Sequence, residues 1–455
     1  MTAEVSPEHT QMAESPVNVE EPLKQEETAG EENNLEASNG KNPSPDLIPE
    51  VDERRASFKE ESNFLSDLKE SERNALFELQ SKLEEAIAQG NLLEKDSKEA
   101  TDQEGRDANN KDYSIWGVPL LPSKGGKSTD VVLLKFLRAR EFKVKDAFEM
   151  LKNTLRWRKE NRVDSILDEV VLKDEFGKAG FINGIDREGH PVCYNVLGVF
   201  QDAEISRIVF GSEEGRKKFL RSRVQLMEQG IKELDMRPGA VSSMLHITDL
   251  KDMIGLSKKE VRDTLKLAVQ LLQDNYPEFV ARHVVINAPF WYYALNAILS
   301  PFLTQRTKNK FVVVRPAKVT ETLLKYISAE AIPTHYGGLK RENDSEFSME
   351  EGRVLELTVK PASFGTIEIP ALETGTTVLW DFSVLGWEVN YRAEFVPADE
   401  GAYTVIVQKG KRIGAEEEPI RNSFRNNEPG KVILTIENST VKKKRVFYRY
   451  KVTSA

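Results

Sequence analysis

The apolar pattern of this sequence changes after Tyr336-Gly337-Gly338. Between residues 180 and 340, short apolar runs such as Met244 to Asp249 alternate with amphipathic segments of helical period. Strands that alternate with helices predict a largely parallel sheet, joined here to a hairpin around Asp186-Arg187-Glu188-Gly189. Beyond residue 350 only alternating runs remain, separated by turn residues at about ten-residue intervals, which predicts an all-β sandwich.

The N-terminal segment, residues 1–57, has a different composition from the rest of the chain. Residues 1–57 contain no aromatic residue, and the first fifty hold twelve acids and two bases, so they account for the whole net charge of −10. Such a segment buries too little apolar surface to offset its ordering entropy and is expected to be disordered. It is either a solubilising acidic tail or a regulated one, in which Ser57 follows two arginines.

Helices are expected after this tail. Apolar residues at three- and four-residue steps predict a helix over 58–90, and two more are expected over 129–162. Thr129 or Asp130 would cap the first of these two, and Asp146 with Glu149 would form a capping box for the second. A further capping box is expected at Ser257 and Glu260. Basic residues crowd the pair over 129–162: Lys135, Arg138, Arg140, Lys143, Lys145, Arg156, Arg158 and Lys159.

Composition and spacing exclude several classes of protein. A single cysteine, Cys193, excludes an intrachain disulfide, and the five histidines show no metal-binding spacing. The loop Ser123 to Thr129 ends like a phosphate-binding loop, but Leu121 stands where that motif needs glycine. His190 and Cys193 lack a third orienting group, so a packed cysteine is the better interpretation. We therefore expect no enzyme activity, no cofactor, no metal and no nucleic-acid partner.

The segment Pro289 to Leu303 is apolar on nearly all sides. A helix of that kind is buried in a core or covers an apolar cavity, and the two prolines at positions 289 and 301 argue against a membrane span. With no apolar leader at the N-terminus, the cytosol is the expected compartment. Glu278 and Lys310 flank the neighbouring apolar strands, so a pocket for an amphiphile such as a phospholipid is indicated.

Five motifs, in order and register over residues 127–340, resemble the CRAL-TRIO lipid-transfer family. They are Leu134 to Phe142, Asp249-Leu250-Lys251, Asn275-Tyr276-Pro277-Glu278, Ile286 to Phe290 and Tyr336-Gly337-Gly338. The β segment, with Trp380-Asp381-Phe382 and Gly401-Ala402-Tyr403, looks like a GOLD domain, and the whole chain is similar to the plant patellins.

The resemblance implies a multidomain chain with five parts. They are a disordered acidic tail (1–57), a helix plus polar linker (58–112), a helical CRAL-TRIO N-terminal lobe (113–164), an α/β CRAL-TRIO lipid-binding domain (165–342) and an all-β GOLD sandwich (346–455).

The resemblance also implies site residues. Arg140, Glu278 and Lys310 match the positions that read an inositol phosphate in fungal relatives, and His246 lies at a further headgroup position. The chain departs from that pattern at Glu141, Met244, His246 and Phe279. A mobile gate helix would carry Phe290, Trp291, Tyr293, Leu295, Ile298, Leu299 and Phe302. Independently, the dense basic run Lys442, Lys443, Lys444 and Arg445 is either a membrane-binding patch or a solvated turn.

The favoured interpretation is a phosphoinositide carrier or presenter that binds anionic membranes peripherally, with a possible protein partner on the GOLD domain. Patellin-like function would place it in membrane trafficking at the forming cell plate during cytokinesis. Two alternatives stay open. One is a membrane-tethered adaptor that uses lipid as a sensor, and the other is a carrier of a neutral isoprenoid such as tocopherol, which the departures at Met244, His246 and Phe279 favour.

Overall fold

The computed structural model describes eight stretches of the chain. They are residues 60–93, 113–169, 176–253, 259–293, 305–347, 353–386, 388–414 and 417–453. The predicted tail and the polar linker that ends at residue 112 lie outside these stretches.

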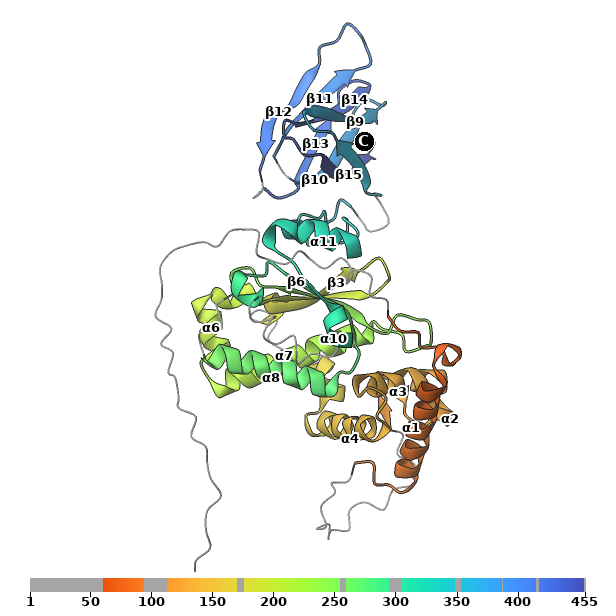
Figure 1. The fold of residues 1–455 in the computed structure, drawn as a ribbon. Helices are drawn as coiled ribbons and strands as arrows, with labels where there is room; N and C mark the ends of the chain where they lie inside the picture. The colour runs from red at the N-terminus through yellow and green to blue at the C-terminus, as the bar shows by residue number, and fades with distance from the viewer. Residues whose placement is uncertain are drawn as a thin grey trace, which may run out of the picture. The chain divides into compact units, whose positions relative to one another are not determined.

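A five-stranded sheet organises the α/β part, with the strand order β3-β4-β5-β6-β7 (Figure 1). Strands β3 and β4 form the predicted antiparallel hairpin, and all the other neighbours are parallel. The predicted largely parallel sheet is therefore confirmed. The strands are β3 (Gly180–Ile185), β4 (Pro191–Val196), β5 (Met244–Asp249), β6 (Val280–Ile286) and β7 (Phe311–Val313).

Helices cover both faces of this sheet (Figure 1). Helix α11 (Val319–Tyr326) packs on the face that presents Val192 and Leu245. Helix α7 (Glu213–Lys232) packs on the opposite face, where Gly230 approaches Met244 so closely that a Cβ would meet the sulfur at 2.1 Å. Helices α6 (Ala203–Phe210) and α8 (Lys259–Asn275) complete that layer. Short connecting elements are η5 (Gly177–Ala179), η6 (Leu197–Gln201), α10 (Gln305–Lys310), η8 (Pro316–Lys318) and η9 (Thr334–Tyr336).

The N-terminal lobe is helical and has its own apolar core. Leu76, Leu79 and Leu83 form the buried stripe of α1, and they pack with Phe136 of α3 and Leu151 of α4. The predicted helical lobe thus buries one continuous apolar cluster. Its elements are η3 (Leu65–Asp67), α1 (Glu70–Ala88), β1 (Ser114–Ile115), β2 (Val118–Pro119), α2 (Pro122–Gly125), α3 (Lys127–Ala139), α4 (Val144–Glu160) and η4 (Val163–Asp168).

The predicted helix starts are wrong at three places. The helix expected from residue 58 begins at Glu70, and α3 begins at Lys127 because Gly126 turns the chain there with a φ of 53°. Thr129 is therefore inside the helix, where its hydroxyl donates to the Pro119 carbonyl at 2.7 Å. Helix α4 begins before Asp146, so no capping box forms there. The capping box predicted at Ser257 lies outside the described residues.

Three of the motif residues meet at the carboxyl ends of β5 and β6. The Asp249 carboxylate accepts hydrogen bonds from the Asn287 amide at 2.7 Å and from the Tyr336 hydroxyl at 2.9 Å. It also accepts the backbone N–H of Lys251 at 2.8 Å. A carboxylate that is 5% exposed needs such partners, because burying it unpaired would be costly. These motif residues are therefore structural, and they fix where the chain leaves the sheet.

The C-terminal part is a sandwich of two antiparallel four-stranded sheets, as predicted. Their strand orders are β13-β10-β15-β8 and β12-β11-β14-β9. Trp380, Phe382, Tyr391 and Phe395 fill the space between the sheets, and the Trp380 indole donates to the Tyr391 hydroxyl at 2.9 Å. The strands are β8 (Leu355–Val359), β9 (Ser363–Ala371), β10 (Thr377–Leu385), β11 (Val389–Pro397), β12 (Val405–Ile413), β13 (Ile420–Arg425), β14 (Gly430–Asn438) and β15 (Lys444–Thr453).

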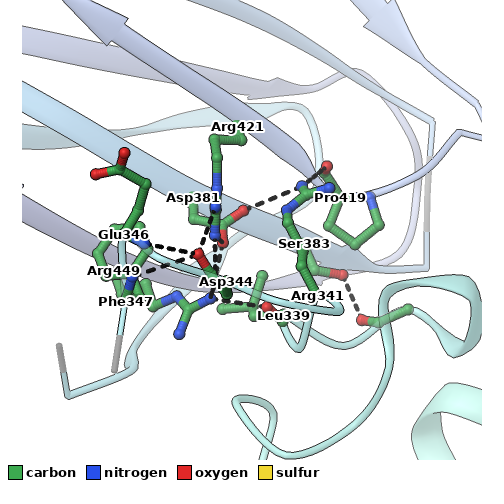
Figure 2. A network of polar contacts seen from close by, with 11 residues as sticks. Leu339, Arg341, Asp344, Glu346, Phe347, Asp381, Ser383, Pro419, Arg421 and Arg449 are labelled. Atoms are coloured by element: carbon green, nitrogen blue, oxygen red, sulfur yellow. Dashed lines mark hydrogen bonds and ion pairs between the residues drawn. The ribbon is translucent and has the colours of Figure 1, made fainter. Parts of the chain in front are cut away.

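A buried ionic network ties residues 339–347 to the sheet of β10, β13 and β15 (Figure 2). Asp381, which is fully buried, accepts from Arg421 at 2.7 Å and from Arg449 at 3.0 Å, and Arg341 lies 3.4 Å from it. Asp344 accepts two further bonds from Arg421, which hold the pKa of that carboxyl at about 2. Two aspartates thus compensate three guanidinium groups in one cluster.

Replacing Asp381 by alanine should lower the free energy of unfolding by about 3–5 kcal/mol, because three guanidinium groups would then share one carboxylate. Guanidinium chloride unfolding, followed by tryptophan fluorescence, measures this change. The matched control is Glu368→Ala, which removes an exposed pair with Lys431 and should cost less than ~1 kcal/mol. Equal losses in the two variants would contradict a structural role for the network.

Candidate functional site

Cationic side chains from distant segments surround a cavity of about 140 Å³ at the amino end of β6. Helix α3 contributes Lys135 and Arg138, and α10 contributes Arg306 and Lys310. Glu278 lies between them, just before β6. Residues 60–63 and 239–242 form the remaining wall. Lys135 and Arg138 are three residues apart and therefore share one face of α3.

Lys135 is buried, and no carboxylate among the described residues forms an ion pair with it. Its ammonium group donates to the backbone carbonyls of Ser242 at 2.6 Å and Glu278 at 2.9 Å, and it lies 4.4 Å from the centre of the Phe279 ring. Burial lowers the pKa of Lys135 to about 7. A buried ammonium with so low a pKa is poised to gain from an additional negative charge in the cavity.

Glu278 and Lys310 form the ion pair at the centre of the site. Lys310 Nζ donates to Glu278 Oε2 at 2.6 Å, and Arg306 Nη1 lies 3.8 Å from the other oxygen. The backbone of Glu278 adopts a φ of 53°, which a non-glycine residue rarely takes and which costs of order 1 kcal/mol or more. Strain of this kind is found where the surrounding structure holds a side chain in place for a task.

Arg138 is the most heavily bonded cation of the cavity, and its partners come from residues 61–63. It donates to the Ser62 carbonyl at 2.6 Å and to Asn63 Oδ1 at 2.5 Å, and its Nε lies 3.0 Å from Glu61. Arg306 donates to the same Glu61 carboxylate at 2.7 Å. Burial lowers the pKa of Arg138, although nearby acids oppose this effect.

Glu60 anchors the same wall to the sheet. It accepts hydrogen bonds from His190 at 3.0 Å and from Ser243 at 2.6 Å, while Asp186 binds the other ring nitrogen of His190 at 2.9 Å. Burial alone would lower the pKa of His190, but the hydrogen bonds from its ring to Asp186 and Glu60 raise it to about 10. His190 is therefore a charged structural residue and does not pair with Cys193, which is buried and whose pKa burial raises to about 12.

Of the headgroup residues inferred from the resemblance, the structure brings Glu278 and Lys310 together in the cavity. Arg140 follows the last residue of α3, and its guanidinium donates to the Ala139 carbonyl at 3.2 Å, away from the cavity lining. His246 is buried on β5, 6.0 Å from the His283 ring, and also outside that lining. Burial lowers its pKa to about 3, so it is neutral, and its Nε2 atom has no hydrogen-bond partner among the described residues.

The predicted gate helix is described only at its start. Phe290 is 65% exposed, and Trp291 and Tyr293 are partly buried. The other predicted gate residues, Leu295, Ile298, Leu299 and Phe302, lie outside the described residues.

Two members of the basic run at 442–445 already have partners within the sandwich domain, Lys444 in its interior and Arg445 on its surface. Lys444 is buried and donates to the Gly386 carbonyl at 2.6 Å, and Arg445 pairs with Glu356 at 2.6 Å. Lys442 and Lys443 are exposed in the connection before β15. The cationic surface available there is thus smaller than the sequence indicates.

Of the seven charged residues that line the cavity, the sequence analysis predicted two, Glu278 and Lys310. Lys135, Arg138 and Arg306 were not predicted as site residues, although the first two belong to the basic crowd of 129–162. Their spacing of three residues was the available signal. No local pattern pointed to residues 60–63, whose partners Arg138 and Arg306 in the cavity are 75 to 245 residues away.

Family comparisons agree with the observed architecture. Residues 75–153 match the CRAL/TRIO N-terminal domain and residues 175–338 match the CRAL/TRIO domain. Residues 360–444 match the Patellin-1-like, C-terminal GOLD domain. The fold and the cavity thus define a lipid-binding protein in which a CRAL/TRIO domain precedes a GOLD domain.

Individual relatives make the assignment more specific. The chain is 47% identical to Patellin-4 of Arabidopsis thaliana, over 99% of each chain. It is 46% identical to Patellin-3 of the same plant, over 88% of this chain and 79% of that one. Identity to Patellin-6 is 42%, over 88% of this chain and 91% of that one. The chain belongs to the patellin family.

Neither a membrane-spanning helix nor a metal-binding cluster is found in the described stretches. No described helix is both long enough and apolar enough to cross a bilayer. No group of three or more His, Cys, Asp or Glu side chains among the described residues could hold a metal ion.

The contact between His190 and Glu60 predicts a pH dependence of stability. The folded-state pKa of His190, about 10, lies above its unfolded value near 6.5, so its contribution is complete below pH 6.5 and is lost as the pH rises toward 10. The pKa of Glu60 is lowered to about 2, so Glu60 stays ionised over that range. The stability difference between wild type and His190→Gln should therefore shrink from pH 6.5 to pH 10.

Urea unfolding at several pH values measures this difference. His335→Gln is the matched control. Desolvation lowers the pKa of His335 below its usual 6.5, so this residue is mainly neutral in both the folded and the unfolded protein above pH 7. Its stability difference should stay constant from pH 7 to 10. A constant difference for His190→Gln as well would show that His190 is not charged in the fold.

Proposed function

We propose that this protein carries or presents phosphoinositides and binds membranes peripherally, without enzymatic activity, from the cytosol. The observation that carries the proposal is the cavity into which Lys135, Arg138, Arg306 and Lys310 converge. Four cations within reach of one small cavity suit a phosphate monoester, which carries a charge of about −1.5 to −2 at pH 7. Arginine adds bidentate hydrogen bonding to phosphate, and lysine adds a point charge.

The apolar character of the predicted gate segment supports a lipid, and not a soluble phosphate compound, as the ligand. Each buried lipid CH₂ contributes about 0.8 kcal/mol, so a carrier needs an apolar interior that competes with the bilayer. The exposed ring of Phe290, at the start of the predicted gate helix, suits contact with a membrane surface during exchange. Exposed Lys442 and Lys443 would add electrostatic attraction to anionic lipids, at about 1 kcal/mol each.

By kinship with the patellins, we place this activity in membrane trafficking at the forming cell plate during cytokinesis. The GOLD domain would bind a protein partner there. A membrane-tethered adaptor that uses lipid only as a sensor shares this site. The two functions differ in whether transfer of lipid between vesicles depends on the cavity.

A neutral isoprenoid such as tocopherol is the second candidate ligand. One observation favours it, namely the neutral and unpartnered Nε2 atom of His246 among buried side chains. A single hydroxyl group would satisfy that atom. Such a ligand leaves the four cations of the cavity without a role, so the phosphoinositide is preferred.

Lys310→Ala should reduce retention of phosphoinositide by at least about tenfold. The change removes one cation and leaves Glu278 less compensated, so the cavity would also repel the phosphate. The full-length protein is incubated with mixed-lipid vesicles that contain phosphatidylinositol phosphates and tocopherol, repurified, and its lipid extract is measured by mass spectrometry. Lys318→Ala, which removes an exposed lysine paired with Glu321, is the matched control.

The lipid that is retained decides between the functions. A stoichiometric phosphoinositide lost only in Lys310→Ala supports the carrier, and transfer between vesicles should fall in parallel. Retained tocopherol would replace the proposed ligand. If wild type transfers no lipid although it recruits partners to vesicles, the adaptor is the better description.

Charge reversal at Lys442 and Lys443 should weaken binding to vesicles with 20% phosphatidylserine by about tenfold or more, since each lysine near an anionic surface contributes about 1 kcal/mol. Vesicle flotation at 50 and 300 mM salt measures the change, and the difference from wild type should narrow at high salt. Lys69→Glu with Lys82→Glu, which reverses one exposed charge just before α1 and one on it, is the control. An equal loss in both variants would argue against a local patch.

A further inference from the structure

Residues 60–63, Glu60-Glu61-Ser62-Asn63, lie against the cationic cavity and form part of its wall. We call them the acidic strap. They precede α1 and belong to no helix or strand. Their ion pairs join them to Arg138 on α3, to His190 before β4 and to Arg306 on α10. The strap is thus held by polar contacts with three separate parts of the fold.

The strap occupies several of the donors that a phosphate would use, while Arg306 Nη1 and Arg138 Nε make no hydrogen bond to any described residue. Arg306 Nη2 donates to both oxygens of the Glu61 carboxylate, at 2.7 and 3.0 Å, and Arg138 adds a charged contact at 3.0 Å. The remaining donors of Arg138 are taken by the Ser62 carbonyl and by Asn63 Oδ1. A carboxylate between two guanidinium groups presents two acceptor oxygens as a phosphate does, but with a smaller negative charge than the −1.5 to −2, roughly, of a phosphate monoester.

The charge balance at the cavity also indicates that the strap takes the place of a phosphate. With the strap in place, the four basic side chains face the carboxylates of Glu61 and Glu278, while Glu60 is paired with charged His190. Without Glu61, Glu278 alone would remain opposite the four basic side chains. The low pKa of Lys135, near 7, reflects a buried position that the present acids do not fully compensate. A phosphate monoester would restore the missing charge.

The strap is also exchangeable, in contrast to a core element. The Glu61 side chain is 47% exposed and its partner Arg306 is 27% exposed, whereas Arg138 is 8% exposed. Solvent at the exposed side of Glu61 screens its attraction to the arginines, so these pairs contribute less to stability than a fully buried pair would. A dianion that enters the cavity therefore competes against partly screened contacts of Glu61, while the covalent tether keeps the strap at a high effective concentration.

We propose that the acidic strap is an internal competitor for the phosphate of the ligand, which must displace Glu61 from Arg138 and Arg306 to bind. This inference rests on the proposed function and adds a regulatory step to it. The apparent binding affinity is the affinity of the open form multiplied by the fraction of molecules in which the strap is open. Any change that removes negative charge from the strap opens the site. Raised salt weakens the ion pairs of the strap and the binding of the phosphate together.

The test compares full-length wild type with Glu61→Gln and with Glu60→Gln/Glu61→Gln. Each is titrated with phosphatidylcholine vesicles containing 5% phosphatidylinositol 4-phosphate, with pure phosphatidylcholine vesicles, and with soluble inositol 1,4-bisphosphate. The control Glu70→Gln/Glu84→Gln removes the same charge from exposed positions of α1. Melting temperatures verify folding, and Glu61→Gln keeps the anchor between Glu60 and His190 intact.

Both strap variants should bind the phosphorylated ligand about fivefold or more tightly than wild type, and the control should not. Tightening toward the vesicles identifies a lipid headgroup as the ligand, and tightening toward the soluble compound alone identifies a free inositol phosphate. Both results support the competition, but the second would overturn the phosphoinositide carrier.

Unchanged affinity in folded strap variants, with wild type binding the ligand, would overturn the competition and leave the proposed function intact. Equal tightening in the control, or toward pure phosphatidylcholine, would also overturn it, because the effect would then be one of net charge. If neither wild type nor variants bind any phosphorylated ligand, both the competition and the proposed function fail.

Discussion

The fold depends on pairing charges that it removes from water. An unpaired buried charge costs several kcal/mol, so each buried carboxylate or guanidinium group fixes the position of its partners. Asp249 does this where β5 and β6 end, because its partners Asn287 and Tyr336 come from two later parts of the chain. Asp381 does the same for the segment that leads into the sandwich. The two carboxylates thereby set where the sheet ends and how the chain continues.

Periodicity predicted most of the described fold, because apolar spacing reports directly which face of an element is buried. The alternation after residue 350 predicted the sandwich, and the run at Met244 predicted a strand of the largely parallel sheet, which is β5. Helix starts were predicted less well. The interpretation of Thr129 as a cap missed that Gly126 turns the chain three residues earlier, and that the Thr129 hydroxyl is used by the Pro119 carbonyl. Tertiary contacts decided those boundaries.

The cavity was only partly predictable for a related reason. Glu278 and Lys310 follow from the resemblance, and their ion pair shows that the two positions are adjacent in space. The same resemblance selected Arg140, which lies beyond the end of α3, whereas Arg138 faces the cavity. Several basic residues near the end of α3 were candidates for binding a phosphate. Which of them faces the cavity depends on the rotation of the last helical turn. The strap was beyond any sequence rule, because polar contacts across more than 70 residues leave no periodic trace.

Carboxylates in this molecule differ in whether another anion could replace them. Asp381 is fully buried and shared among three arginines, so no soluble anion could reach its position without unfolding the junction. Glu61 makes contacts of similar length with two arginines, yet it is 47% exposed and lies on a segment outside the secondary structure. The two carboxylates thus have ion pairs of similar length, but Asp381 is fully buried and accepts hydrogen bonds from three arginines, whereas Glu61 is half exposed and accepts them from Arg306. The cavity combines strong donors with a weakly held acceptor, which is the arrangement that reversible binding of a phosphate requires.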